Sequence, residues 1–235
     1  MNSLLTKRQQ DILIGSVLGD GGIYARDQGN PYYYVKQSEK NRDYIFWLYQ
    51  EFSNLCPSQP KQRRDNNQWY FYSSRLESFT PFRISFYESG RKRIPIEIGK
   101  LLTSPLSLAI WYMDDGTLDY RVKDHCAFSL TVNCFNNGEV ELLSNALKKN
   151  FGILSTIQNP LCRGKRYPKL YIGARGREKF LKFVQPHIHK CFAYKLPQNR
   201  VSPSETDSVP PWCGRDRRYL LVRKKTSIIR RAPIL

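Results

Sequence analysis

Two apolar runs in this chain end in the same way. Residues 12–18 are apolar or small throughout and lead to Asp20-Gly21, and residues 108–113 lead to Asp115-Gly116. A helix formed by either run would have no polar face for solvent, so we expect two buried helices. A carboxylate at the end of a buried run is costly unless it binds something. The repeat therefore predicts two related halves that each supply one acid to a shared site.

Local signals define where these two helices begin. Thr6, with Gln9 three residues later, has the pattern of a capping box and predicts a helix over 7–19. Ser104-Pro105 supplies an N-cap and a first-turn proline for a helix over 104–113.

Two glycines on the first helix indicate a close partner. Gly15 and Gly19 lie four residues apart and leave a smooth strip on one helical face. Glycine is unfavourable inside a helix, so we expect a second helix packed tightly against this strip. If the two apolar helices pack side by side, Asp20 and Asp115 emerge at the same end.

The pattern that follows each helix is also repeated. Each half shows strand signals, then an amphipathic helix (about 40–55 and 137–150), then further strands and a closing helix. The predicted fold is α+β: two pseudo-symmetric αββαββα halves, each with a four-stranded antiparallel sheet, packed through the two apolar helices. The expected domains are 1–101, 102–200 and a basic C-terminal extension, 201–235. The predicted strands are 22–26, 32–38, 69–75, 83–89, 117–122, 126–133, 152–158 and 169–175.

Charge indicates the class of partner. The 235 residues include 38 Lys and Arg but only 20 Asp and Glu, a formal net charge of +18. Such an excess is best offset by phosphates, and aromatics interleaved with basic residues favour a folded reader of nucleic acid. The basic stretch 215–231 is either a solvated tail or an additional phosphate-contacting arm.

Cysteine and histidine do not form a metal motif. None of the six cysteines forms a C-x-x-C pair, and the three histidines do not complete a zinc spacing. We expect free thiols in a reducing compartment. Residues 1–11 are polar and mixed in charge, so no secretory signal is expected, and no apolar run reaches the ~18 residues of a membrane span. Two aspartates without a nearby histidine suit Mg²⁺ (or Mn²⁺).

The motifs LIGSVLGDG (13–21) and LAIWYMDDG (108–116) resemble those of the LAGLIDADG homing endonucleases in their single-chain form. The segment 92–116 is similar to the subgroup encoded in group I introns, and the resemblance covers about residues 7–200. It implies that the motif helices form the interface between the halves. It also implies that two saddle-shaped sheets lie in the major groove of a long DNA target.

The resemblance further implies a mechanism. The last acid of each motif, Asp20 and Asp115, binds Mg²⁺, and each strand is cut across the minor groove to leave short 3′ overhangs. The positions considered for metal binding are Gly19, Asp20, Asp114 and Asp115. We expect Asp114 to point elsewhere around its helix, and its match in the first motif is Gly19, so an essential role is not expected.

Four further residues carry over from the family as catalytic candidates. An amide follows each motif at nearly equal spacing, Gln37 and Asn133, although Lys36 competes with Gln37 by one step of strand register. Lys92 and Lys195, each with a proline close behind, match the basic residues that lie near the scissile phosphates.

Side chains on the sheets are expected to contact DNA. Arginine can pair with guanine, and glutamine or asparagine with adenine, in the major groove. The candidates are Arg26, Gln28, Asn30, Tyr32, Tyr34, Lys36, Arg75, Arg121, Lys123, Arg163, Lys165, Arg166 and Lys169.

The expected function is a site-specific, Mg²⁺-dependent double-strand DNA endonuclease, active as a monomer and serving intron mobility. An organelle location is expected if it is intron-encoded, and a cytoplasmic one otherwise. The main alternative is an RNA-binding maturase that assists splicing of a group I intron, since basic and aromatic residues also suit RNA. A DNA-binding regulator and a repair or restriction nuclease are further alternatives.

Overall fold

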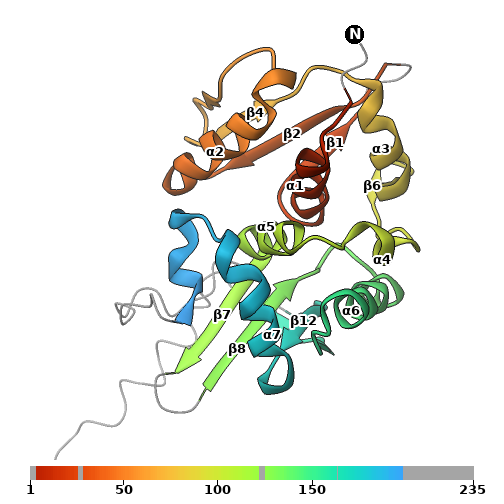
Figure 1. Ribbon diagram of the computed structural model, residues 1–235, viewed down its shortest axis with the longest axis vertical. Coiled ribbons are helices and arrows are strands. Elements are labelled where there is room, and N and C mark those ends of the chain that lie inside the picture. The colour runs from red at the N-terminus through yellow and green to blue at the C-terminus, as the bar shows by residue number, and fades with distance from the viewer. Residues whose placement is uncertain (1–3, 26–28, 122–124, 163, 198–235) are drawn as a thin grey trace, which may run out of the picture.

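The computed structural model describes residues 4–25, 29–121, 125–162 and 164–197 (Figure 1). The first half contains α1 (Lys7–Leu18), β1 (Gly22–Tyr24), β2 (Tyr32–Gln37), α2 (Arg42–Phe52), β3 (Lys61–Gln62), β4 (Trp69–Tyr72), α3 (Thr80–Phe86), β5 (Tyr87–Glu88), β6 (Arg91–Lys92) and α4 (Ile98–Leu101). The second contains α5 (Pro105–Asp115), β7 (Gly116–Arg121), β8 (His125–Thr131), α6 (Asn137–Phe151), β9 (Thr156–Gln158), β10 (Leu161–Cys162), β11 (Lys165–Arg166), β12 (Lys169–Ile172) and α7 (Ala174–Val184).

The two halves share one sheet topology. Their four-stranded sheets have the orders β1-β2-β4-β3 and β7-β8-β12-β9, and every neighbouring pair is antiparallel. Helix α2 contacts the first sheet, and α6 and α7 contact the second, while α1 and α5 lie against each other between the halves (Figure 1). The predicted α+β fold with two antiparallel sheets is confirmed.

The apolar helices begin and pack as predicted. The Thr6 capping box is present, and Ser104 accepts from the backbone of Leu106 at the start of α5. A Cβ atom added at Gly15 would lie 2.3 Å from the carbonyl oxygen of Ser107, so glycine permits the backbones to approach. The Ser107 hydroxyl donates to the carbonyl of Asp11 over 2.7 Å, which ties α5 to α1. The two helices share one buried hydrophobic core.

The strand predicted over 83–89 is wrong. Residues 80–86 form helix α3, with Pro81 in its first turn, and only Tyr87–Glu88 is extended. The fourth strand of the first sheet is instead β3, which pairs with β4. Its two residues are both exposed, so no hydrophobic alternation marks them in the sequence. The predicted strand over 152–158 is shortened to β9.

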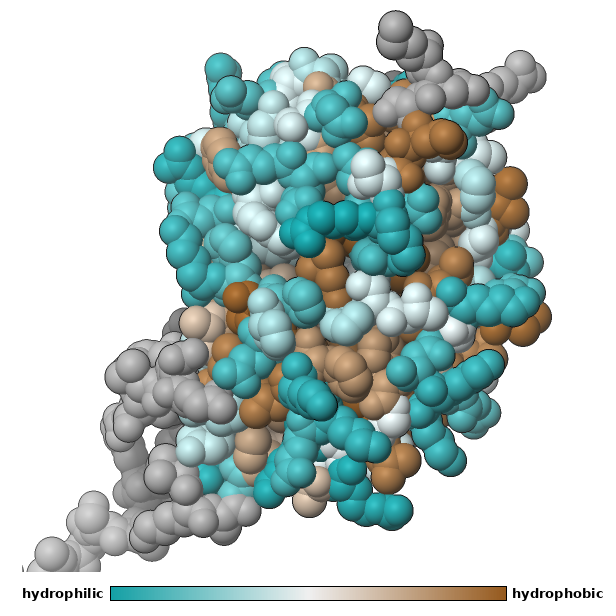
Figure 2. All heavy atoms as spheres, viewed as in Figure 1, coloured by the Kyte–Doolittle hydropathy of each residue, from teal (hydrophilic) through white to brown (hydrophobic). Residues whose placement is uncertain are grey.

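Some predictions lie outside the described residues: Arg26, Gln28, Lys123, Arg163 and the whole of the extension 201–235. The division at 101 and 200 stays a prediction. Within the described ranges, no helix is both long and apolar enough to cross a membrane. Hydrophilic side chains cover most of the face shown in Figure 2, with small hydrophobic patches among them.

Candidate active site

The two motifs end against each other. Helix α1 ends at Leu18, and Asp20 follows in the turn, whereas α5 continues through Asp115 before β7 begins. The backbone N–H of Asp20 donates to Oδ2 of Asp114 over 3.2 Å. This contact brings one acid of each half together at one end of the helix pair.

Asp114 does not point away from this centre, which corrects the expectation from the sequence. Its side chain occupies the space that a side chain at Gly19 would need. A Cβ atom added at Gly19 would lie 2.5 Å from Cβ and 2.7 Å from Oδ2 of Asp114. The missing side chain in the first motif therefore makes room for the additional acid of the second. Helix packing, which the sequence alone does not give, determines that direction.

An amide holds Asp20 in place. Nε2 of the buried Gln37 donates to Oδ2 of Asp20 over 2.7 Å and approaches Oδ1 of Asp114 at 3.4 Å. Nδ2 of Asn41 donates to Oε1 of Gln37 over 2.9 Å, which orients the amide towards the acids. Asn41 was not predicted; its position four residues after Gln37, just beyond the end of β2, is the only sequence signal for it. The competing residue Lys36 is exposed on the opposite face of β2.

Asn133 is not the counterpart of Gln37. Gly22 pairs with Tyr34 in the first sheet, and Thr117 pairs with Ser129 in the second. Gly22 and Thr117 each lie two residues after the acid of their motif, so their partners Tyr34 and Ser129 occupy equivalent positions. Three residues further along, the buried Val132 is equivalent to Gln37, and Asn133 lies one residue beyond. Asn133 is exposed, and no hydrogen bond joins it to Asp115 in the described structure. A one-residue difference in register exchanges the two faces of a strand, which the similar spacing concealed.

Both predicted lysines reach the ends of the motif helices. Nζ of Lys92 donates to the carbonyl of Gly19 over 2.8 Å. Nζ of Lys195, only 7% exposed, donates to the carbonyls of Met113 (2.6 Å) and Tyr112 (3.3 Å). A cation is favourable at a helix C-terminus, where the unpaired carbonyls gather. Each lysine thus places positive charge beside the acids, and the charges of both lysines act on both Asp20 and Asp115.

The acids strongly perturb one another. Burial, followed by the charge of Asp20, raises the pKa of Asp115 to about 7. Burial together with the charges of Asp20 and Asp115 raises the pKa of Asp114 well above its ordinary value, and loss of hydration also raises the pKa of Asp20. Burial lowers the pKa of Lys195 to about 8, although the three acids oppose this shift. Grouped carboxylates with raised pKa values are typical of functional sites.

The sequence matches the LAGLIDADG DNA endonuclease family over residues 10–180. The chain belongs to this family. It is 25% identical to DNA endonuclease I-ChuI of Chlamydomonas applanata, covering 82% of this chain and 95% of that protein. It is 29% identical to the probable intron-encoded endonuclease 1 of Wickerhamomyces canadensis (82% and 85% covered) and 30% identical to the cytochrome b mRNA maturase bI2 of Saccharomyces cerevisiae (79% and 46%).

A solved structure shows the same fold. The homing endonuclease I-WcaI, bound to its DNA recognition sequence, superposes with a TM-score of 0.72 at 27% identity, covering 83% of this chain and 88% of that one. The resemblance of this chain to LAGLIDADG homing endonucleases with intron-encoded relatives is therefore confirmed.

The LAGLIDADG centre has donors that suit a hard divalent cation. Asp20 and Asp115 offer carboxylate oxygens at adjoining helix ends, and the charge of Asp20, which raises the pKa of Asp115, is the kind of repulsion that a cation relieves. Within the described part of the chain, no group of three or more His, Cys, Asp or Glu is arranged as a complete metal cage. Mg²⁺ commonly takes one or two carboxylates and completes its shell with water and substrate phosphate, so an incomplete protein cage fits this ion.

The described DNA-binding candidates lie on the outer sheet faces and on neighbouring loops. Tyr32, Tyr34 and Lys36 alternate with buried residues on β2, and Arg121 and Lys169 lie on the second sheet. Asn30 precedes β2, Arg75 follows β4, and Lys165 and Arg166 form β11. Sequence reasoning missed Tyr24, Tyr70 and Tyr72, which extend the same outer face; strand alternation was the available signal.

Proposed function

We propose that this LAGLIDADG protein is a site-specific double-strand DNA endonuclease that hydrolyses phosphodiester bonds with Mg²⁺ or Mn²⁺. The observation that carries this proposal is the grouping of Asp20 and Asp115, one acid from each half, close enough at one end of the α1–α5 pair that the charge of Asp20 raises the pKa of Asp115. A shared centre with one acid from each half is suited to cutting two strands of one duplex.

Each residue of the centre has a distinct role in this proposal. Asp20 and Asp115 would hold the cation, which supplies activation of water and charge stabilisation on the attacking and leaving oxygens. Gln37 orients the Asp20 carboxylate through its 2.7 Å hydrogen bond. Lys92 and Lys195 place positive charge where scissile phosphates would approach. Cleavage across the minor groove, with short 3′ overhangs, follows from the family resemblance.

The wider setting is part of the same proposal. A chain with both motifs is expected to act as a monomer on double-stranded DNA, and its intron-encoded relative supports a role in intron mobility within an organelle. The similarity to a yeast maturase favours one second function, binding of intron RNA to assist splicing, although this chain spans less than half of that protein.

Cleavage of a randomised duplex library, with the cut ends sequenced, tests the proposal. The full chain is incubated with Mg²⁺ or with EDTA, beside the variants Asp20→Asn and Asp115→Asn. The control is Asp43→Asn, because the Asp43 carboxylate is exposed and forms an ion pair with Lys190. We expect one long target with short 3′ overhangs, cut by the wild type and the control only. Both active-site variants should still bind that target.

The outcomes separate the candidate functions. Double-strand cutting by either active-site variant would refute the assigned acids. Tight binding of structured intron RNA, unaffected by both substitutions and without any DNA cutting, would favour the maturase function instead. Binding of DNA without Mg²⁺-dependent turnover would indicate a regulator.

A further inference from the structure

Five tyrosines share the outer face of the first sheet. Tyr24 on β1, Tyr32 and Tyr34 on β2, and Tyr70 and Tyr72 on β4 alternate along their strands with buried residues. The alternating residues Ile23, Tyr33, Val35 and Phe71 form the inner face and are fully buried. Tyr24 is 48% exposed, and the other four tyrosines are partly exposed. This set is called the tyrosine face below.

The rings of the tyrosine face form one connected surface. Tyr24 lies 5.9 Å from Tyr32 and 5.8 Å from Tyr34, measured between ring centroids. Tyr34 lies 5.8 Å from Tyr70, and Tyr32 lies 6.4 Å from Tyr72. A contiguous exposed aromatic surface is unfavourable in water and typically marks a binding site.

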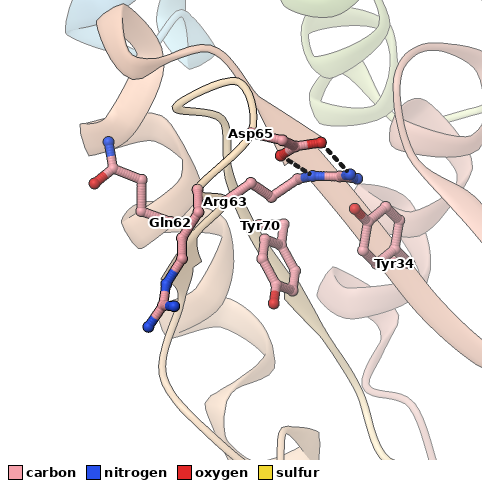
Figure 3. A pocket seen from close by; sticks show the side chains of 6 residues that line it. Tyr34, Gln62, Arg63, Asp65 and Tyr70 are labelled. Carbon is pink, nitrogen blue, oxygen red and sulfur yellow. Dashed lines mark hydrogen bonds and ion pairs between the residues drawn. The ribbon is translucent and has the colours of Figure 1, made fainter.

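Basic groups border this surface. Lys36 is exposed on the same face of β2, and the guanidinium of Arg75 lies 5.5 Å from the ring centroid of Tyr32. Arg63 donates to both carboxylate oxygens of Asp65, over 2.9 and 2.7 Å, and its guanidinium lies beside the hydroxyl of Tyr34 (Figure 3). Arg63, Asp65 and Tyr34 line a recess together with Tyr70, Gln62 and Arg64. An aromatic surface with a cationic border suits a polyanion that also presents apolar groups.

The second sheet does not carry this surface. The strand pairings place Asp119, Ala127, Ser129 and Lys169 at the positions of Tyr24, Tyr32, Tyr34 and Tyr70. Only Tyr171 matches a tyrosine, Tyr72. Because the two sheets have the same topology, the tyrosines are not required by the fold. The two faces are built for chemically different contacts.

The tyrosine face leads directly to the active centre. Strand β2 carries Tyr32, Tyr34 and Lys36 outward and then ends at Gln37, which is bonded to Asp20. A duplex whose phosphate reaches Asp20 must therefore extend over this face. At about 3.3 Å per residue, Tyr34 and Tyr32 lie roughly 10 and 17 Å along the strand from Gln37. That distance corresponds to about three to five base pairs at 3.4 Å each.

We infer that the tyrosine face reads the C5-methyl groups of thymines in the half-site that lies against the first sheet. The thymine methyl is the apolar group that base edges present in the major groove, and aromatic side chains pack against it. The second sheet, with Asp119, Ser129 and Lys169 at matching positions, depends on polar contacts instead. This inference rests on the proposed DNA endonuclease function and adds the chemistry of one half-site.

Thymine-to-deoxyuridine substitution in the cleaved target tests this inference, since it removes the methyl group and keeps the base-pairing edges. Duplexes carry deoxyuridine in one half-site or the other, and binding is measured in Ca²⁺ with the wild type, Tyr34→Ala, Tyr34→Phe and the control Tyr171→Ala. We expect a loss of about fourfold in affinity for each contacted thymine in one half-site only, within about six base pairs of the cut.

The variants identify the sheet responsible. The deoxyuridine effect should shrink in Tyr34→Ala and persist in Tyr34→Phe and Tyr171→Ala. Equal effects in both half-sites, or no effect in either, would overturn the inference while cleavage continued. Weaker binding of Tyr34→Phe with no deoxyuridine effect would also overturn it and indicate phosphate contacts by the hydroxyl. A protein that cleaves no duplex would refute the proposed function itself.

Discussion

The backbone N–H of Asp20 donates a hydrogen bond to the carboxylate of Asp114 over 3.2 Å, so a side chain of the second motif holds the acid of the first. The reverse contact has no side chain to make it, because Gly19 stands where the first motif would need an acid. The two motif ends therefore share a backbone plan but differ in chemistry. Gln37 adds to this difference, since Val132 occupies its equivalent position.

Replacing Asp114 with alanine should slow the two strand cleavages unequally. The substitution removes an acceptor for the Asp20 N–H and a neighbour of Gln37, whereas the backbone of Asp115 stays within α5. Loss of a hydrogen bond to a charged group is worth about 1.5–3 kcal/mol, or roughly 10- to 100-fold in rate. Nicking rates of the two end-labelled strands measure the effect, and Asp114→Asn, which keeps an acceptor, should be milder. Equal slowing of both strands would contradict this prediction.

Gln37→Ala should reduce cleavage, and Asn133→Ala should not. Gln37 is buried and bonded to Asp20, while Asn133 is exposed and one register step away from the matching position. We expect a loss of roughly tenfold for Gln37→Ala, corresponding to one hydrogen bond of about 1.5 kcal/mol, with duplex affinity nearly unchanged. Single-turnover cleavage of the identified target gives both rates. A comparable loss in Asn133→Ala would restore the symmetric arrangement predicted from spacing.

The metal-free protein should be more stable in mild acid than at neutral pH. Because the folded-state pKa of Asp115 is raised to about 7, the folded protein binds this proton more tightly than the unfolded chain. That stabilisation is complete below about pH 4, the ordinary range of an aspartate, and is lost as the pH rises to about 7. Thermal unfolding in EDTA should thus give a higher Tm at pH 5 than at pH 7.5.

The substitution Asp115→Asn provides the control for this pH dependence. It should raise Tm at pH 7.5 and flatten the acid-side slope, with each kcal/mol equivalent to roughly 2–4 °C. Lys195 has the opposite effect, because its pKa is lowered to about 8 and the unfolded chain binds this proton more tightly. The free energy of unfolding should therefore rise between about pH 8 and pH 10. A Tm in the variant that followed the wild-type pH profile would exclude Asp115 as the titrating group.

Gly15→Ala should destabilise the protein because the helix pair has no room for a methyl group. The added Cβ would lie 2.3 Å from the carbonyl of Ser107 and 2.9 Å from Cβ of Ile110. Overpacking of this kind costs about 1–3 kcal/mol, although alanine favours a helix locally. Chemical denaturation measures the change, with Gly99→Ala as a control, since an added Cβ there meets nothing within 4 Å. An unchanged midpoint for Gly15→Ala would mean that the helices can separate slightly.

The sequence by itself determined the elements whose signals are local. Capping residues, apolar runs and turn-forming Asp-Gly pairs located both motif helices and their acids, because these patterns act within a few residues. The repeat of the same order along the chain predicted two sheets of one kind. The family resemblance, with a proline close behind each lysine, indicated Lys92 and Lys195, which the structure places at the motif helix ends.

Only the tertiary structure decided which neighbouring residue faces the centre. Asp114 and Asp115 are adjacent on one helix, and the packing of α5 against α1 determines that both approach Asp20. Strand register, not spacing, placed Gln37 at the site and Asn133 outside it, because one step along a strand exchanges its two faces. The tyrosine face likewise depends on pairing between β2 and β4, whose residues are far apart in sequence. Contacts between distant segments follow from packing, which a local pattern does not encode.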